Sequence, residues 1–218
     1  MSVGKEVALL FAVLFLPGMI AQTGEIAPEA FESVMYHIQV LAISIPQVLL
    51  VVVLGDLRRP GSSRAYGFRN PERRDITATI IGLLASWAAV WLISVVLGML
   101  GIDGEAMEPG VEWTFGRPDL IPLAFLSTLA IGYREEIFFR AFITDRAEEA
   151  GADPRVALAA AAFVFALGHL YQGVLGFIVS LTIGLVLAAV YFRTRSLHGI
   201  AVAHGLYNLV VLLAAGAA

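Results

Sequence analysis

The sequence contains no cysteine, and this absence excludes disulfide bonds, thiolate catalysis and cysteine-ligated metal sites. Charged residues are also scarce: they make up 15% of the 218 residues, against about 25% in a typical soluble domain. Hydrophobic residues make up 59%, and the mean hydropathy is +0.83. These values exclude an ordinary soluble domain and indicate an integral membrane protein that crosses the bilayer several times.

Seven apolar runs are candidate membrane spans, since about 20 apolar residues cross the hydrocarbon core. Backbone polar groups in lipid have to be satisfied within the segment, and runs this long and uniformly apolar are helical rather than barrel strands. The sequence therefore predicts an all-α fold, a polytopic membrane helical bundle of about seven transmembrane helices. The predicted spans are 6–23, 36–55, 76–101, 119–143, 155–172, 174–194 and 197–216.

The first span is compatible with two interpretations. Lys5 precedes its apolar run, as the basic residue of a signal peptide would. No cleavage site of small residues is evident around Ala21, so we expect a retained helix.

Basic residues are concentrated in one set of loops, whereas the opposite loops, around residues 23–32 and 102–113, are acidic. The positive-inside rule then places the N-terminus in the cytoplasm and, with seven spans, the C-terminus outside. We expect the plasma membrane, with membrane lipids around the helices and no nucleic-acid partner. The basic residues predicted on the cytoplasmic side are Lys5, Arg58, Arg59, Arg64, Arg69, Arg73, Arg74, Arg146, Arg155, Arg193 and Arg195.

The chain divides into two parts by its polar content. Residues 1–118 contain three membrane helices with almost no polar residues inside them, and residues 119–218 contain the unusual polar ones. The sixth span carries small residues at steps of four, which allow another helix to come close; they are Gly176, Ser180, Gly184 and Ala188. We therefore predict that 119–218 forms a tight four-helix catalytic core.

Two adjacent glutamates lie near the end of the fourth span, where ionisable residues are costly and usually mark function. Glu136 and Arg140 are i, i+4 on one helix face, so we expect them to pair. Glu135 points about 100° away and is expected to be free for another role. The long side chain of Arg134 could extend its charge to the membrane interface. A purely structural role for the Glu136–Arg140 pair stays open.

Further polar residues lie on the fifth and seventh spans. Phe165 and His169 share one helix face, and so do His204 and Asn208. A buried histidine is often only a packing residue, but a carboxylate, two histidines and an asparagine on neighbouring helices favour hydrolysis. A glutamate can act as general base on water, and a histidine and an asparagine can donate to an oxyanion. Alternatively, Glu135, His169 and His204 could bind zinc.

Three short motifs occur in order on these spans: EEIFFR at 135–140, FALGH at 165–169 and HGLYN at 204–208. They resemble the EExxxR, FxxxH and HxxxN motifs of the CAAX prenyl protease and bacteriocin-processing (CPBP, or Abi) family of intramembrane proteases. The resemblance covers about residues 120–210. It implies that Glu135 activates water with help from His169. It further implies that His204 and Asn208 stabilise the oxyanion, and that Glu136, Arg140 and Phe165 have orienting or structural roles.

The resemblance implies an intramembrane endopeptidase of the CAAX prenyl protease type, acting near the cytoplasmic membrane face on a peptide or lipidated-protein substrate. We expect no cofactor, with a zinc-dependent version of the same protease as the alternative. A non-catalytic membrane protein that binds a peptide or confers immunity is a second hypothesis. A small transporter with a Glu–His proton relay is a third, and it would be expected to show inverted repeats or broken helices.

Overall fold

The structure is a computed structural model, and it describes residues 2–21, 28–58, 61, 66–67, 69–102 and 115–215. Every regular element in these ranges is a helix, which confirms the predicted all-α fold class. The elements are α1 (Val3–Leu14), α2 (Leu16–Ala21), η1 (Pro28–Glu32), α3 (Val34–Arg58), α5 (Arg73–Met99), η3 (Pro118–Leu120), α6 (Ile121–Glu136), η4 (Ile137–Phe142), α7 (Ile143–Glu149), α8 (Pro154–Leu167), η5 (Leu170–Gln172), α9 (Gly173–Thr194) and α10 (Leu197–Ala215).

Four helices in the described part are long and apolar enough to cross a membrane, and they coincide with four of the seven predicted spans. They are α3, α5, the run 170–194 that contains α9, and α10. The other three predicted spans form shorter or interrupted helices. The first is broken at Phe15 into α1 and α2, and the fifth ends at Leu167 as the 14-residue α8. The fourth is α6, which continues through the π-helical η4 into α7.

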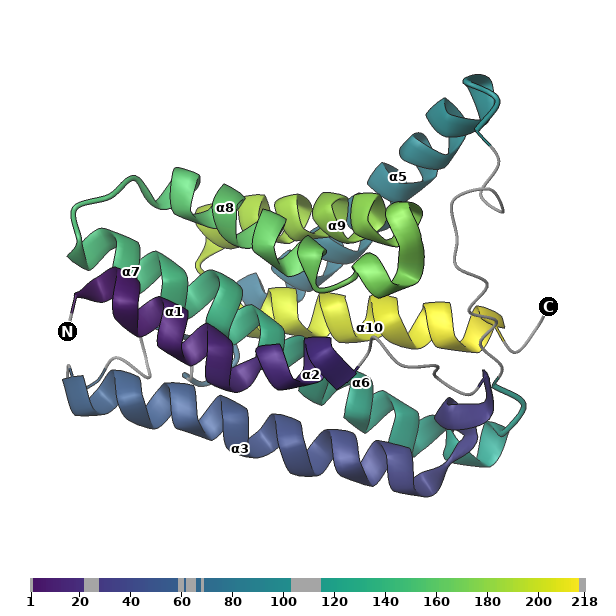
Figure 1. The fold of residues 1–218 in the computed structure, drawn as a ribbon, viewed down its shortest axis with the longest axis horizontal. Coiled ribbons are helices and arrows are strands. Elements are labelled where there is room, and N and C mark those ends of the chain that lie inside the picture. Colours follow the sequence, from purple (N-terminus) through teal and green to yellow (C-terminus); the bar gives the residue numbers. More distant parts are fainter. Residues whose placement is uncertain are drawn as a thin grey trace.

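The bundle is arranged around α10, which lies at its centre (Figure 1). Here α10 packs against both α6 and α5, while α3 covers α6. On the opposite side α8 packs against α9, and α9 packs against α5. This arrangement brings α10 against α6, and α8 against η4, the segment that follows α6.

The long helices expose large apolar side chains and bury charged ones, which is the reverse of the distribution in a soluble protein. Large apolar side chains point outward from the long helices: Leu57 is 76% exposed, Leu84 63% and Trp91 67%. By contrast, Glu136 and Arg140 are almost completely buried. An apolar outer surface suits hydrocarbon as the surrounding medium, which agrees with an integral membrane protein.

Glycines allow α6 and α10 to approach closely where the two helices cross. A Cβ added at Gly132 would lie 2.4 Å from the carbonyl oxygen of Ala201, and one at Gly205 would lie 2.8 Å from Cα of Leu129. Any side chain at these two positions would force the helices apart. The crossing therefore holds the end of α6 close to the middle of α10.

The predicted small-residue ridge on α9 is partly a helix contact. Gly184 faces Ala162 of α8, and Ser180 and Ala188 are buried. Gly176 instead faces Gln172 of its own segment, because the chain turns there between η5 and α9.

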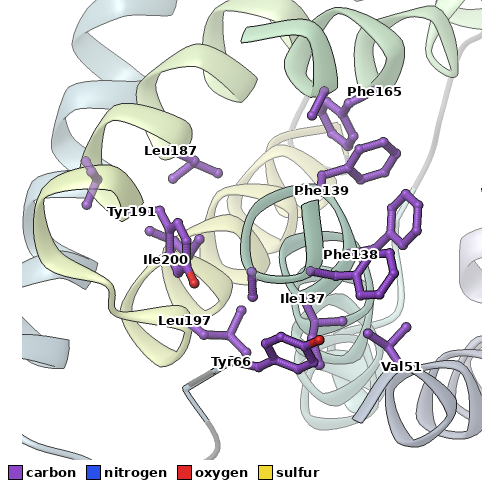
Figure 2. Packing of buried hydrophobic residues seen from close by; sticks show 14 of the residues in the cluster. Val51, Tyr66, Ile137, Phe138, Phe139, Phe165, Leu187, Tyr191, Leu197 and Ile200 are labelled. Atoms are coloured by element: carbon purple, nitrogen blue, oxygen red, sulfur yellow. The ribbon is translucent and has the colours of Figure 1, made fainter. Parts of the chain in front are cut away.

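The hydrophobic core gathers around the π-helical segment η4. Figure 2 shows Ile137, Phe138 and Phe139 of this segment among core side chains from other helices, with Val51 of α3 close by. Val51 and the residues of η4 belong to one cluster, so residues 1–118 and 119–218 share a core. The functional division at residue 118 stays a prediction.

Ion pairs bring several helix ends together at one end of the bundle. Arg58 at the end of α3 pairs with Glu6 of α1 and with Glu149 of α7, and Arg195 after α9 pairs with Glu148. Arg58 and Arg195, which are predicted to share one side of the membrane, therefore lie at the same end of the bundle, where α3, α7 and α9 end (Figure 1). Arg59, Arg64 and most of the two acidic loops (22–27 and 103–114) lie outside the described residues.

Candidate active site

The end of α6 and the middle of α10 are joined by a buried cluster of three charged or ionisable side chains. Oε1 of Glu136 accepts a hydrogen bond from Nδ1 of His204 at 2.8 Å. The same oxygen lies 3.0 Å from Nη1 of Arg140. The predicted i, i+4 pairing of Glu136 with Arg140 is confirmed. The contact of Glu136 with His204 was not predicted, because residue spacing along one helix gives no information about contacts between two helices.

Arg140 extends this cluster to two further helices. Its Nη2 donates to the carbonyl oxygen of Gly184 on α9 at 3.0 Å. Its guanidinium lies 5.1 Å from the ring centre of Phe165 on α8, within the range of a cation–π contact. Gly184 leaves room for the guanidinium, because a Cβ there would lie 3.3 Å from Nη2. One arginine therefore links α6, α8 and α9 next to His204.

Glu135 has its own set of partners. Its Oε1 accepts a hydrogen bond from Nη2 of Arg134 at 2.8 Å, and its Oε2 lies 3.7 Å from Nε2 of His204. The prediction that Glu135 is unpaired is therefore wrong. The side chain of Arg134 turns inward, and its guanidinium lies over the ring of Phe15. The adjacent carboxylate of Glu135 offsets part of the cost of burying this cation.

His169 follows the end of α8, and its ring is oriented by the last turn of that helix. Nδ1 lies 3.0 Å from the carbonyl oxygen of Phe165, and the two rings are 4.6 Å apart. The predicted proximity of Phe165 and His169 is confirmed. A carbonyl oxygen can only accept, so Nδ1 carries the proton and Nε2 is left as an acceptor in the neutral ring.

The four predicted catalytic residues line one cavity of about 430 Å³. They come from α6, from the turn after α8 and from α10; they are Glu135, His169, His204 and Asn208. Asn208 is half-buried, and its side-chain amide bonds to none of the described residues. The cavity therefore presents a carboxylate, two imidazoles and a free amide to a common space.

A smaller cavity of about 90 Å³ lies on the other side of Glu135. Its far wall is formed by α1 and α2 through residues such as Phe11, Phe15 and Met19. Glu135, His169 and Arg134 line both cavities. These side chains therefore form the boundary between the two spaces.

The predicted zinc alternative requires Glu135, His169 and His204 to converge on one point. In the part of the chain that the structure describes, no group of three or more histidine, aspartate or glutamate side chains is arranged to hold a metal ion. Glu135 and His204 are instead engaged by Arg134 and Glu136. The observed donor arrangement does not suit a zinc ion.

Other residues of the larger cavity were not expected from the motifs. Tyr36 and the fully buried His37 come from α3, and Tyr171 comes from η5. His37 has both ring nitrogens engaged, by Ser127 at 2.8 Å and by the carbonyl oxygen of Phe31 at 3.0 Å. For these residues the sequence offered one signal, the polar His37 near the start of an apolar run.

Comparisons with known proteins point to the same segment. No curated protein and no solved structure matches the chain. The model of a family described as Type II CAAX prenyl endopeptidase Rce1-like matches residues 117–210, the segment that contains all three motifs. The predicted resemblance to the CAAX prenyl protease family is thereby confirmed over residues 117–210, and a membrane peptidase is the activity that the match supports.

Proposed function

We propose that the chain is an intramembrane endopeptidase of the CAAX prenyl protease type. In this proposal Glu135 activates a water molecule that hydrolyses a peptide bond near the cytoplasmic membrane face. The observation that carries the proposal is the convergence of four groups on one cavity inside the matched segment. These groups are Glu135, His169, His204 and Asn208.

The general base in this scheme is Glu135. A water molecule bound to its carboxylate can also donate a hydrogen bond to Nε2 of His169, the ring nitrogen left free by the contact with Phe165. The water oxygen attacks the carbonyl carbon of the peptide while its proton passes to Glu135. Glu135 then returns the proton to the leaving amine as the carbon–nitrogen bond breaks, giving a carboxylate product and an amine product.

The oxyanion in this scheme is stabilised from α10. His204 and Asn208 are one helical turn apart, so both can donate toward the same carbonyl oxygen. Because Glu136 accepts from Nδ1 of His204, donation from Nε2 in this scheme requires a proton on both ring nitrogens. The Glu136–Arg140 cluster would thus orient His204 without touching the substrate.

The cavity walls favour a peptide with an apolar portion. Away from Glu135 the walls include Val179, Ile183, Val211 and Leu212, which provide an apolar surface beside the polar groups. This supports a lipidated protein or a hydrophobic peptide as the substrate, within a membrane-lipid environment.

The test is cleavage of a panel of prenylated CAAX peptides and unprenylated membrane peptides by the purified protein. Glu135→Gln should lower the rate by about 10²–10⁴-fold, because a general base contributes about that factor. The matched control is Glu148→Gln, which removes a carboxylate from the surface pair with Arg195 and should leave the rate unchanged.

Adding a chelator to the same assay distinguishes the glutamate–water mechanism from the zinc-dependent one. We expect a chelator to leave cleavage unchanged. Cleavage that a chelator abolishes and zinc restores would contradict the glutamate–water mechanism and support the zinc-dependent protease. If the folded wild type binds peptides, cleaves none and matches Glu135→Gln in cells, the peptide-binding or immunity role replaces the peptidase.

A further inference from the structure

A second polar cluster lies where α10 begins. The carboxylate of Asp75 on α5 accepts hydrogen bonds from Oγ of Ser196 at 2.5 Å and from the two terminal nitrogens of Arg69 at 2.7 and 3.0 Å. Asp75 is 5% exposed and Ser196 is completely buried. Among the described residues that line the two cavities of the site, none belongs to this cluster. Any role of the cluster in the reaction therefore has to pass through α10.

The first turn of α10 is fixed against α5 by this cluster and its neighbours. Oγ of Ser196 accepts a hydrogen bond from the backbone nitrogen of Gly199 at 3.0 Å, as a helix N-cap does. Oγ1 of Thr79 on α5 lies 3.1 Å from the carbonyl oxygen of Gly199. A Cβ added at Gly199 would lie only 2.5 Å from Cβ of Ala78, so the two helices are in close contact there. A shift or rotation of α10 at this end would break these contacts.

The same two helices also meet beside the proposed oxyanion donors. The ring centre of Trp87 on α5 lies 4.7 Å from that of Tyr207, the residue before Asn208. A Cβ added at Gly82 of α5 would lie 3.1 Å from Cβ of Ala203, the residue before the other donor. One helix therefore supports α10 both at its first turn and next to the groups that face the substrate.

We propose that Asp75 is a positioning residue of the peptidase: through Ser196 it sets the axial position and rotation of α10, and hence the places of His204 and Asn208. The inference rests on the proposed peptidase function and extends its machinery to α5, which lies outside the matched residues 117–210. Oxyanion stabilisation requires donors within about 2.7–3.1 Å of the developing charge, so a small displacement of α10 weakens it.

Asn208 depends on this support more than His204 does. Nδ1 of His204 is also held by Oε1 of Glu136 at 2.8 Å. The side-chain amide of Asn208, by contrast, bonds to none of the described residues, so the backbone of α10 determines where it lies. Loss of the Asp75 contacts should therefore act mainly through Asn208.

The test is a double-mutant cycle between Asp75 and Asn208, measured on a peptide that the wild type cleaves. Asp75→Asn keeps the size of the side chain but replaces one accepting oxygen and removes the charge beside Arg69. It should lower kcat by about 10-fold to 100-fold, because a misplacement of about 1 Å can cost about 10²-fold. KM should stay within about 2-fold, since the contact strengthens only in the transition state.

In the Asn208→Ala background, Asp75→Asn should lower kcat by less than about 3-fold, because the group that it positions is already absent. A loss of folded protein would instead multiply with the effect of Asn208→Ala, so the cycle separates positioning from folding. Asp119→Asn is the matched control. It removes the charge of an exposed aspartate that pairs with Arg117, and it should leave kcat unchanged.

The position of α10 can also be followed without a substrate. When the other two tryptophans of the sequence are changed to phenylalanine, Trp87 is the single tryptophan, and it reports its contact with Tyr207. Tryptophan emission responds to the surroundings of the ring. Asp75→Asn and Ser196→Ala should therefore change the emission maximum or lifetime of Trp87, whereas the control variant should not.

Three results would overturn the inference while leaving the peptidase intact: an unchanged kcat in Asp75→Asn, a fully multiplicative loss in the double variant, or unchanged Trp87 emission. If Asp75→Asn does not fold, Ser196→Ala replaces it in the cycle with the same expected outcome. A wild type that cleaves no peptide would instead contradict the proposed function itself. The emission of Trp87 then decides whether Asp75 positions α10.

Discussion

Glu135 and Glu136 are neighbours in the sequence and both lie beside His204, but the structure pairs them with different arginines. The i, i+4 spacing was enough to predict that Glu136 faces Arg140, since such residues share a helix face. The Arg134–Glu135 pair could not be predicted in the same way, because adjacent side chains on a helix do not face each other. It forms because the long arginine side chain turns back toward the carboxylate.

Asn208 offers the cleanest test of oxyanion stabilisation at the residue scale. Asn208→Ala should lower kcat by about 10²–10³-fold, as removal of one oxyanion donor does. KM should change little, because the contact strengthens only as charge develops on the oxygen. Steady-state kinetics on a cleaved peptide measure both values.

The thermal stability of Asn208→Ala should stay within about 0.5 kcal/mol of the wild type, as for substitutions away from packing contacts. Its amide bonds to none of the described residues, so no protein partner is left unsatisfied. A large loss of stability together with the loss of kcat would indicate a structural role instead.

Arg140 provides the contrasting prediction, in which stability is the readout. Arg140→Met should destabilise the fold by about 3–5 kcal/mol, because it leaves the buried carboxylate of Glu136 without its cation. The double variant Glu136→Gln/Arg140→Met removes both charges and should recover part of that loss. Denaturation of the purified protein in detergent compares the three proteins.

An additive loss in the double variant would contradict the coupling of the two charges. Glu148→Gln is a suitable reference, because Glu148 pairs with Arg195 and both side chains are exposed. Such pairs contribute about 0–1 kcal/mol, so this variant should change stability little.

At the scale of elements, the site depends on how closely α6 approaches α10. The sequence pattern drew attention to the small residues of α9, of which Gly184 does face another helix. It gave no such signal for Gly132 and Gly205, which are isolated glycines on two helices far apart in the chain. Which glycines meet is a property of the tertiary packing, and it decides that His204 reaches Glu136.

Gly205→Ala should separate the two helices. Its Cβ would lie 2.8 Å from Cα of Leu129, and backbone atoms cannot move aside as a flexible side chain could. We expect destabilisation of about 1–3 kcal/mol, typical of overpacking, together with a loss of peptidase activity. Thermal unfolding and peptide cleavage measure the two effects.

Gly98→Ala in α5 is the matched control, because a Cβ there meets nothing within 4 Å. Alanine favours a helix over glycine by about 0.5–1 kcal/mol, so this variant should be as stable as the wild type or slightly more so. An equal effect of the two substitutions would contradict the importance of the crossing.

The π-helical turn η4 is the element that the sequence did not indicate. Apolar periodicity predicts a continuous helix through Ile137–Phe142, and it does not distinguish an α from a π turn. The difference matters because η4 follows the glutamate pair directly and contains Arg140. Wider turns of this kind frequently occur at functional sites.

At the scale of the whole molecule, composition was sufficient for the fold class but not for the number of spans. Hydropathy identified the four long helices, whereas it merged α1 with α2 and extended α8 past Leu167. Mean hydropathy over a run is insensitive to a single break such as the one at Phe15. Residues of α1 and α2 on both sides of the break line the smaller cavity beside Glu135.

The absence of native cysteine makes the predicted topology directly testable. Arg155→Cys and Asp119→Cys place single thiols at exposed positions at opposite ends of the bundle. We expect a membrane-impermeant maleimide to label position 155 only from the cytoplasmic side and position 119 only from outside. Labelling in intact cells reports the outer side of the membrane, and labelling in inverted vesicles reports the cytoplasmic side.

The reverse pattern would contradict the orientation given by the positive-inside rule while leaving the fold intact. Labelling of both positions from one side would contradict the bundle arrangement itself. The wild type, which has no thiol, is the background control for each preparation.

The two cavities that meet at Glu135 have a consequence for turnover. A peptide that fills the larger cavity displaces the water on that side of the carboxylate. The smaller cavity, at about 90 Å³, has room for several water molecules, since one needs roughly 10–15 Å³. In the proposed mechanism each hydrolysed bond consumes one water, and the smaller cavity offers a route for its replacement that does not pass the substrate. Return of water to Glu135 and departure of the products would then be separate events, so slow release of a bulky product would not keep water from the carboxylate.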